Sequence, residues 1–440
     1  MGRHVAIIGG GFSGLAAGVA LTEKGAQVTL LERRGNLGGR AYSFTDPTTG
    51  DVVDNGQHLF MACYHNTIEF LDKIGCRDRL KFQSNTHVDF LDRENGLTPF
   101  DCPSLPAPFH ALIGLMKMKG LSMGDKLGML RAARAFRPGA NGASGLTVEE
   151  WLTGLGQSAA IRERFWYPMA IATLNESPSV ASARMLKKVL ELGFGGKQSE
   201  SKIGIARVGL SDLYVHAARE FIQSRGGTIR ERADVRALVM SSQTIDGCQL
   251  SDGEVIKADC YISAVTPPAF LGILPESLRQ GAFAGISELR SSPIVSVNLW
   301  FDRPVTDCEF AGLIGTNIQW LFNKDVISPA GRKSNHLALV ISAAHKYTGL
   351  TRESLVEMAV RELRDVMPSA RAAKVVHSRI VKEREATISH TIQSDRLRPD
   401  MITPVENLIL AGDWTNTGLP ATIEGAVLSG NSAAEYAAHI

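Results

Sequence analysis

The chain contains few cysteines, and their arrangement argues against two classes of protein. Only six occur in 440 residues. They are scattered, with no Cys-x-x-Cys pair and no histidine spacing typical of zinc. Neither a disulfide framework nor a metal site is therefore expected. The pattern indicates a reduced, cytoplasmic protein.

Long apolar runs are also missing. No uninterrupted stretch reaches the roughly 18 residues that a membrane-spanning helix needs, and the closest, CYISAVTPPAFLGILP, contains three prolines. The net charge is only +2 at pH 7, so nothing favours nucleic acid as a partner. With 440 residues, 44% of them hydrophobic, the chain is long enough for two packed regions that enclose a cofactor.

The first 32 residues have the pattern strand, tight turn, helix, strand (HVAIIG, GGFSG, LAAGVALTEKG, QVTLLE). Gly9, Gly11 and Gly14 fit the motif Gly-x-Gly-x-x-Gly. In this motif the glycines make the turn, let the backbone approach a pyrophosphate, and let helix and strand pack closely. Phe12 and Ser13 open the helix, whose free N–H groups would face the phosphates. The motif predicts a dinucleotide site.

An acidic residue strengthens this prediction. Glu32 ends the second strand, and both Glu32 and the following Arg33 are expected to contact the cofactor. A carboxylate at that place accepts hydrogen bonds from ribose hydroxyls and disfavours a 2′-phosphate, which argues against NADP. No second Gly-x-Gly-x-x-Gly heads a strand–helix–strand unit, so electrons from a nicotinamide would need a separate donor.

Two further motifs lie near opposite ends of the chain. The segment RRGNLGGRAYSF places Gly38, Gly39 and Arg40 after the second strand, and LILAGDW places Gly412 and Asp413 after the last. Together with the first motif they resemble the amine oxidase and phytoene desaturase superfamily of flavoproteins. The resemblance implies non-covalent FAD and a Rossmann-like α/β FAD-binding domain with an inserted α+β substrate domain.

The same resemblance assigns further cofactor contacts and domain boundaries. Val235 would contact the adenine through its backbone, and Gly56 would permit close approach to the flavin ring. Thr422 would cap a helix starting at Ile423, whose N-terminus would face the flavin pyrimidine edge. The expected FAD-binding domain comprises residues 1–65, 203–290 and 400–440, and the expected substrate domain comprises residues 66–202 and 291–399.

The closing loop differs from that of the amine oxidases. They place aromatic side chains just before the Glu-Gly of the last helix, whereas this chain has GLPAT. The missing aromatic cage favours an apolar, isoprenoid substrate over an amine. Three long segments, VVDNGQHLFMACYHNTIEFLDKIG, RFWYPMAIATLNESPSVASARMLKKVL and AGDWTNTGLPATIEGAVLSG, resemble the hydroxysqualene dehydroxylases of bacterial hopanoid synthesis.

This closer resemblance implies a reductive reaction. Hydride would pass from N5 of reduced FAD to the allylic carbon of hydroxysqualene, and the hydroxyl would leave as water, giving squalene. Two alternatives stay open. One is a carotenoid or phytoene-type desaturase that removes hydride from a polyisoprenoid. The other is a non-catalytic, FAD-stabilised protein that binds isoprenoids or a partner synthase.

Dehydroxylation needs an acid near the leaving oxygen. Asp54 and His58 in VDNGQH are the candidates, because they form an acid–histidine pair after the expected flavin-contacting loop. Asp54 would protonate the hydroxyl or orient His58 to do so. The alternative is structural: Asp54 caps a turn and His58 packs beneath the flavin.

A basic segment suggests how a lipid substrate is reached. The pattern from Ala111 to Arg137 is helical, amphipathic and basic, with a single acid, Asp125. Helices near residues 105–137 would either cover the substrate domain or dock on a membrane, with Met and Leu in the lipid and Lys at anionic headgroups. Docking would place a cytoplasmic protein peripherally at the inner membrane surface. Thr147 then predicts the next helix start.

Overall fold

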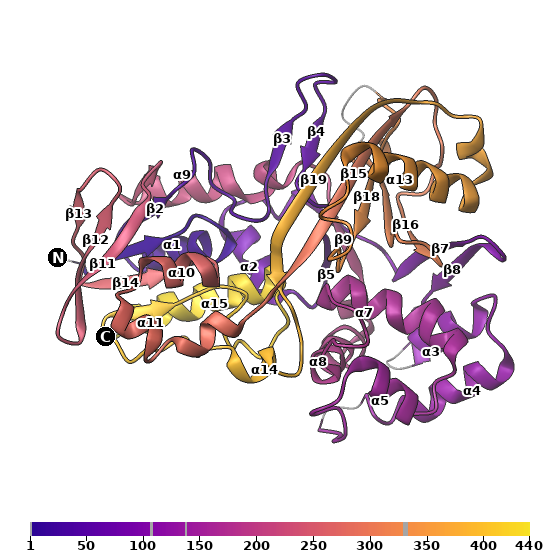
Figure 1. Ribbon diagram of the computed structural model, residues 1–440, viewed down its shortest axis with the longest axis horizontal. Helices are drawn as coiled ribbons and strands as arrows, with labels where there is room; N and C mark the ends of the chain where they lie inside the picture. Colours follow the sequence, from indigo (N-terminus) through magenta and orange to yellow (C-terminus); the bar gives the residue numbers. More distant parts are fainter. Residues whose placement is uncertain (1, 106–108, 137–138, 329–332) are drawn as a thin grey trace.

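Segments from three parts of the chain build one five-stranded sheet (Figure 1). The computed structural model describes residues 2–105, 109–136, 139–328 and 333–440. The strand order is β10-β2-β1-β14-β20, and all neighbouring pairs are parallel. The strands are β1 His4–Ile8, β2 Gln27–Glu32, β10 Thr228–Glu231, β14 Cys260–Ser263 and β20 Leu408–Leu410. This confirms the Rossmann-like α/β fold that the sequence predicts.

Both faces of this sheet are covered. Because successive side chains of a strand point to opposite faces, Val5 and Ile7 of β1 pack into one core and Ala6 and Ile8 into another. The first core contains α1 Phe12–Glu23, α9 His216–Ser224 and α15 Ile423–Ala437. The second contains α10 Pro267–Ile273 and a small antiparallel sheet of β11 Val235–Ser241, β12 Thr244–Leu250 and β13 Val255–Ile256. The strand–helix–strand prediction for the first 32 residues is confirmed.

A seven-stranded sheet forms the other half of the molecule, with the order β19-β15-β18-β17-β16-β7-β8. Its strands are β7 His87–Asp92, β8 Gly96–Asp101, β15 Ser291–Phe301, β16 Phe310–Ile314, β17 Trp320–Asn323, β18 His336–Ile341 and β19 Val375–Ile388. Leu337 and Leu339 face α13 Arg352–Val366, whereas Ala338 and Val340 face a second group of helices. The sheet is therefore enclosed on both faces.

That second group includes the helices expected near residues 105–137. The structure has α3 Phe109–Lys117 and α4 Met123–Ala132 there. The chain breaks at Gly120, whose φ of +72° favours glycine. Ser122 then starts α4 with a capping box, because Ser122 and Asp125 exchange side-chain hydrogen bonds with each other's backbone N–H. Residues 106–108 and Arg137 of this region lie outside the described residues.

Shorter elements join the two halves. The helix start at Thr147 is confirmed, with a capping box to Glu150. No helix among the described residues is long and apolar enough to cross a bilayer.

The remaining strands are β3 Ser43–Thr45, β4 Val52–Asp54, β5 Leu59–Met61, β6 Leu80–Phe82 and β9 Ile203–Ala206. The remaining α-helices are α2 His65–Lys73, α5 Val148–Gly154, α6 Ala159–Ile161, α7 Tyr167–Leu174, α8 Ala183–Phe194, α11 Glu276–Gln280, α12 Lys324–Ile327 and α14 Ser394–Leu397.

Candidate cofactor and substrate site

One cavity of about 650 Å³ extends from the parallel sheet into the second half of the molecule. Its volume lies within the range of small-molecule sites. One part is lined by the turns that follow β1, β2 and β20, and the other by side chains of the seven-stranded sheet and of α7 and α8. The cavity therefore brings together the segments that the sequence assigns to cofactor and to substrate.

The turn after β1 is shaped for a phosphate group. Gly9 has φ +107°, and a Cβ on Gly14 would lie 1.9 Å from the Gly9 carbonyl oxygen, so only glycine allows this crossing of strand and helix. Gly11 precedes α1 and offers no side-chain cap. The buried Ser13 hydroxyl has no hydrogen-bond partner among the described residues. Free N–H groups and an unpaired hydroxyl at a helix N-terminus fit a pyrophosphate.

Glu32 is held at the end of β2 by backbone donors. Its Oε2 accepts a hydrogen bond from Gly10 N at 2.8 Å, and its Oε1 accepts one from Arg34 N at 2.8 Å. The carboxylate is buried yet lines the cavity. It lies beside the turn after β1, where an acid would accept hydrogen bonds from ribose hydroxyls.

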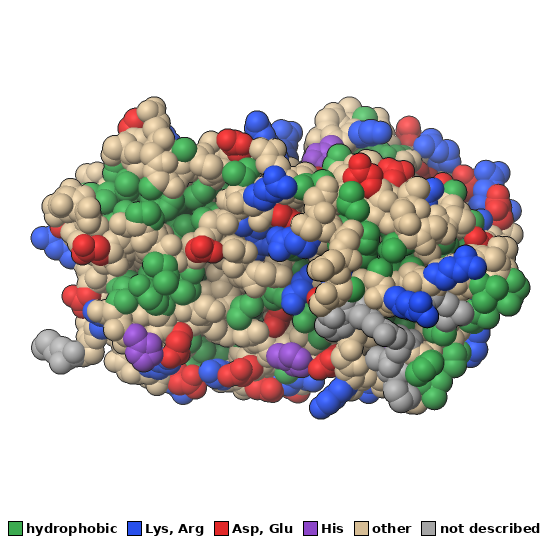
Figure 2. All heavy atoms as spheres, turned by 90° about the horizontal axis from the view of Figure 1, so that it is seen from below, with side chains coloured by type: hydrophobic (Ala, Val, Ile, Leu, Met, Phe, Trp, Pro, Cys, Tyr) green, Lys and Arg blue, Asp and Glu red, His purple; other side chains and the backbone are tan. Residues whose placement is uncertain are grey.

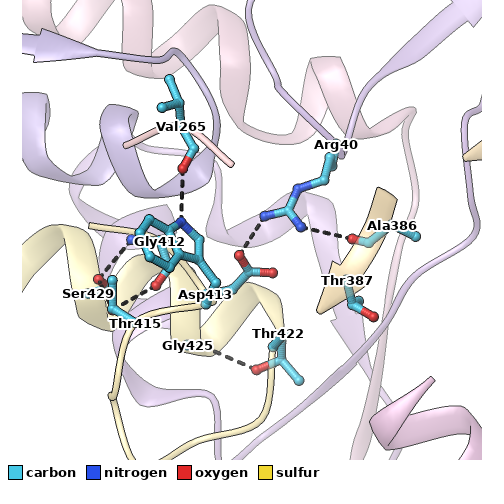
Figure 3. A network of polar contacts seen from close by, with 12 residues as sticks. Arg40, Val265, Ala386, Thr387, Gly412, Asp413, Thr415, Thr422, Gly425 and Ser429 are labelled. Atoms are coloured by element: carbon cyan, nitrogen blue, oxygen red, sulfur yellow. Dashed lines mark hydrogen bonds and ion pairs between the residues drawn. The ribbon is translucent and has the colours of Figure 1, made fainter. Parts of the chain in front are cut away.

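The loop that contains Gly38 and Gly39 packs against the turn after β1. A Cβ on Gly39 would lie 2.9 Å from the Gly11 Cα, so the two loops approach at backbone distance. Arg40 then reaches across the site. Its Nη2 donates to Asp413 Oδ1 at 2.5 Å and its Nη1 to the Ala386 carbonyl at 3.0 Å (Figure 3). This ion pair joins the segment after β2 to the segment after β20 over 373 positions of sequence.

The closing loop is fixed by its own helix. Gly412 N donates to Ser429 Oγ at 2.9 Å, and Thr415 Oγ1 lies 3.0 Å from the same Ser429 oxygen (Figure 3). Thr422 Oγ1 accepts from Gly425 N, so the prediction that Thr422 caps the helix starting at Ile423 is confirmed. The N-terminus of α15 therefore lies at the cavity wall, where its dipole favours negative charge.

Two residues that support this loop were not identified from the sequence. Buried Arg398 donates to the carbonyl oxygens of Leu419 at 2.6 Å and Asp413 at 3.0 Å. Burial lowers the pKa of Arg398 to about 10, which leaves it charged at neutral pH. Glu424 of α15 accepts hydrogen bonds from both Asn66 and Thr67 at the start of α2. Nothing in the local sequence around Arg398 indicates a partner, because its contacts are distant in the chain.

Asp54 and His58, the proposed acid–histidine pair, share no hydrogen bond in the structure. Asp54 does not line the cavity: its Oδ1 accepts from Leu210 N at 2.9 Å and its Oδ2 from Lys324 Nζ at 2.9 Å. Both oxygens are therefore engaged away from the cavity, which favours the structural alternative for Asp54. His58 does line the cavity.

One contact identifies which ring nitrogen of a neutral His58 carries the proton. Its Nδ1 lies 2.7 Å from the Gly56 carbonyl, which can only accept, so Nδ1 carries the proton and Nε2 is a hydrogen-bond acceptor. Burial lowers the pKa of His58, because a desolvated imidazolium is disfavoured. A neutral His58 is a poor general acid at neutral pH.

The structure brings most of the expected residues together. His58 and all the expected cofactor residues except Gly14, which lies behind the turn, line the same cavity. They are Gly9, Gly11, Phe12, Ser13, Glu32, Arg33, Gly38, Gly39, Arg40, Gly56, Val235, Gly412, Asp413, Thr422 and Ile423.

The part of the cavity beyond the cofactor loops is apolar. It is lined mainly by Phe60, Met61, Phe90, Phe165, Met169, Val189, Phe194, Ile203, Ile294, Trp320, Phe322 and Val340. The charged lining residues among the described ones lie instead at the end of β2 and in the segment after it, after β10, in β11 and after β20: Glu32, Arg33, Arg34, Arg40, Asp234, Arg236 and Asp413. No group of acidic, histidine or cysteine side chains that could hold a metal occurs in the described residues. A cationic substrate would find no counter-ion in this part.

Comparison with known proteins identifies the family. The model of the flavin-containing amine oxidoreductases matches residues 12–438. The chain belongs to this family. Hydroxysqualene dehydroxylase of Rhodopseudomonas palustris is 30% identical over 99% of this chain and 98% of the relative. Zeta-carotene desaturase of Arabidopsis thaliana is 27% identical over 98% of this chain and 84% of the relative.

Solved structures agree on the fold. An oxidoreductase from Methanosarcina mazei superposes with a TM-score of 0.78 at 18% identity, covering 98% of this chain and all of the other. Putrescine oxidase bound to putrescine gives 0.72 at 18% identity and covers 99% of both chains. At this identity the likeness concerns fold alone.

As a member of this family, the protein is an FAD-dependent oxidoreductase. Its residues fit the cofactor: the turn after β1 and Ser13 would hold the pyrophosphate, Glu32 the ribose, and the segment around Asp413 and Thr422 the flavin side. When bound, the flavin supplies hydride chemistry that amino-acid side chains do not provide. The non-catalytic alternative is thereby set aside.

Proposed function

We propose that the protein reductively dehydroxylates hydroxysqualene to squalene. The observation that carries this proposal is the cavity, which continues from the cofactor loops into an uncharged, mostly apolar space. A long hydrocarbon gains free energy there, whereas an amine would be left without a counter-ion. The relatives named hydroxysqualene dehydroxylase, which match over nearly the full chain, support the same substrate class.

The closing loop also supports an isoprenoid rather than an amine. Ala421 and Thr422 line the cavity at the entrance to α15, and the loop before them carries Leu419 and Pro420. Residues 418–422, just before α15, carry no aromatic side chain, so they form no cation-binding cage. Trp414, earlier in the segment after β20, lines the cavity, but it is fully buried and its Nε1 donates to the Val265 carbonyl at 2.8 Å.

The overall reaction balances without a further reactant. One hydroxysqualene and one FADH₂ give one squalene, one FAD and one water: a C–O bond breaks, a C–H bond forms, and the flavin loses two electrons. The protein holds the chain in a site that excludes water and keeps His58 neutral. We propose that residues 1–65, 203–290 and 400–440 hold FAD, and that residues 66–202 and 291–399 hold the isoprenoid.

Anaerobic spectroscopy tests the reaction. Reduced, FAD-loaded protein is mixed with hydroxysqualene, and flavin absorbance and squalene are followed together. Reoxidation with one squalene per flavin is expected. A flavin that stays reduced while no squalene forms would refute the proposal.

The second candidate is a carotene-type desaturase, favoured by the zeta-carotene desaturases among the relatives. It runs in the opposite direction, so phytoene or zeta-carotene would reduce oxidised protein in the same anaerobic cuvette. The direction of flavin conversion therefore separates the two.

We further propose that α3 and α4 dock on an anionic bilayer. Figure 2 shows hydrophobic side chains gathered over these helices beside Lys and Arg side chains. Phe109, Met123 and Leu127 are 58%, 61% and 50% exposed. Lys117 and Lys119 are exposed nearby. Exposed apolar side chains beside cations fit the interface of an anionic membrane.

Vesicle flotation tests this docking. Replacing Phe109, Met123 and Leu127 with Ser should abolish binding to vesicles that contain anionic lipid. Leu115 is unsuitable for this test because it is buried in the core. The matched control replaces Val376 of β19 and Ile402, before β20, with Ser; both are exposed but lie outside α3 and α4, so this variant should bind like wild type. Equal flotation of all three proteins would contradict the proposal.

A further inference from the structure

Thr387 lies where the cofactor part of the cavity meets its apolar part. It is the last residue but one of β19 and lines the cavity. The carbonyl of the preceding residue, Ala386, accepts the hydrogen bond from Arg40, which is paired with Asp413 (Figure 3). The Thr387 side chain is thus one residue away from the contacts that build the cofactor site.

Asn175, at the end of α7, determines whether the Thr387 hydroxyl donates or accepts their shared hydrogen bond. Asn175 Oδ1 accepts from Ala343 N at 2.7 Å, and its Nδ2 donates to the Ser292 carbonyl at 3.1 Å and to Thr387 Oγ1 at 3.0 Å. A backbone N–H can only donate and a backbone carbonyl can only accept, so the orientation of the amide is fixed. Thr387 Oγ1 must therefore accept from Asn175.

This leaves the proton of the Thr387 hydroxyl for another acceptor. Within residues 2–105, 109–136, 139–328 and 333–440, no acceptor for it is found. Thr173, another hydroxyl that lines the cavity, differs in this respect because its Oγ1 donates to the Met169 carbonyl at 2.8 Å. Thr387 therefore has a proton to offer to a ligand, and Thr173 does not.

The Thr387 side chain is half-buried, whereas Asn175, which orients it, is buried. Asn175 also has a left-handed backbone, with φ +49°. Its strained conformation is held by the bonds to Ala343 and Ser292. Since one side of this junction is the mostly apolar part of the cavity, a polar atom of a bound chain gains more from a donor there than it would in water.

We propose that Thr387, oriented by Asn175, donates a hydrogen bond to the hydroxyl oxygen of the substrate and so selects a hydroxylated chain over the hydrocarbon of equal length. This inference rests on the proposed function. The bond would hold the hydroxyl-bearing carbon at the junction of the two parts of the cavity, next to the cofactor loops. A desaturase acting on a hydrocarbon would have no use for such a donor.

The test compares binding of two probes to the oxidised, FAD-loaded protein, followed by the flavin absorbance change. Wild type should bind hydroxysqualene about two- to tenfold more tightly than squalene, the range expected for one neutral hydrogen bond. Thr387→Val keeps the shape of the side chain but removes the donor, so the ratio should fall to about one. Thr387→Ser keeps the donor and should keep the ratio.

Matched variants make the result specific. Thr173→Val makes the same replacement in the same cavity at a hydroxyl that is already bonded, and it should keep the preference. Thr387→Ala also lacks the donor and must lose the preference, which covers the case of a Thr387→Val chain that packs poorly. FAD content and squalene affinity should stay within about twofold of wild type in all variants, since a loss of fold would lower both.

Two results would overturn the inference: a wild-type protein without preference for the alcohol, or Thr387→Val and Thr387→Ala proteins that keep it. Failure of the proposed function is a different result. It is seen when reduced wild-type protein forms no squalene, whichever probe binds more tightly.

Discussion

Replacing Lys324 with Met should destabilise the protein strongly, because Lys324 is the cation of a buried ion pair. Its Nζ lies 2.9 Å from Asp54 Oδ2 and 3.0 Å from Gln57 Oε1. The Lys324 and Asp54 side chains are 8% and 3% exposed. Without Lys324, the buried Asp54 carboxylate keeps one backbone donor, Leu210 N. Removing one partner of such a pair costs about 3–5 kcal/mol of unfolding free energy.

The same change should loosen the cofactor site. Gln57 lines the cavity, so a displaced Gln57 should release FAD at lower urea. Urea unfolding followed by tryptophan fluorescence and flavin release measures both effects. Asp54→Asn is neutral and can still accept from the backbone, so the double variant should recover much of the loss. Lys24→Met, which breaks the exposed pair with Glu435, is the control and should cost less than about 1 kcal/mol.

The reasoning is refuted if Lys324→Met loses no more stability than the exposed control. It is also refuted if adding Asp54→Asn does not raise the stability of Lys324→Met. Either result would mean that the buried carboxylate finds compensation that the ion pair does not supply.

Three further predictions concern α15 and its surroundings. Gly430→Ala places a Cβ 2.2 Å from the Ser13 carbonyl oxygen, so stability should fall by about 1–3 kcal/mol, with weaker FAD retention, in the same urea assay. Thr422→Val removes the cap of α15 and should cost about 1 kcal/mol by thermal melting, while Thr422→Ser should not. His390, which accepts from Ala421 N, has a pKa of about 3 because of burial. The unfolded chain binds its proton below pH 6.5, so stability should fall as pH drops from 6.5 towards 3. That fall should be shallower in His390→Gln.

Local sequence patterns predict much of the cofactor half. The strand–turn–helix around Gly9 to Gly14 and the caps at Thr147 and Thr422 follow from residues within a few positions of one another. Their geometry depends on backbone conformation and short hydrogen bonds, which the sequence encodes directly.

Long-range partners were not predictable in this way. From the sequence, the nearby His58 suggests that Asp54 is a catalytic acid. In the structure, the Asp54 carboxylate instead pairs with Lys324, 270 positions away. The helices expected near residues 105–137 are present as α3 and α4, but their boundary at Gly120, where the chain turns, was not predicted. No sequence motif marks Thr387. Its proposed role as a hydrogen-bond donor follows only from the orientation of the Asn175 side chain.

The Arg40–Asp413 pair has a consequence for biosynthesis. Because the two residues are 373 positions apart, the cavity is not complete until β20 and α15 have been synthesised. The turn after β1 is made first, but the nascent chain still lacks the strand, loop and helix that would hold the flavin. We therefore expect cofactor loading to be a late, post-translational step, and a chain released before residue 408 to remain apoprotein.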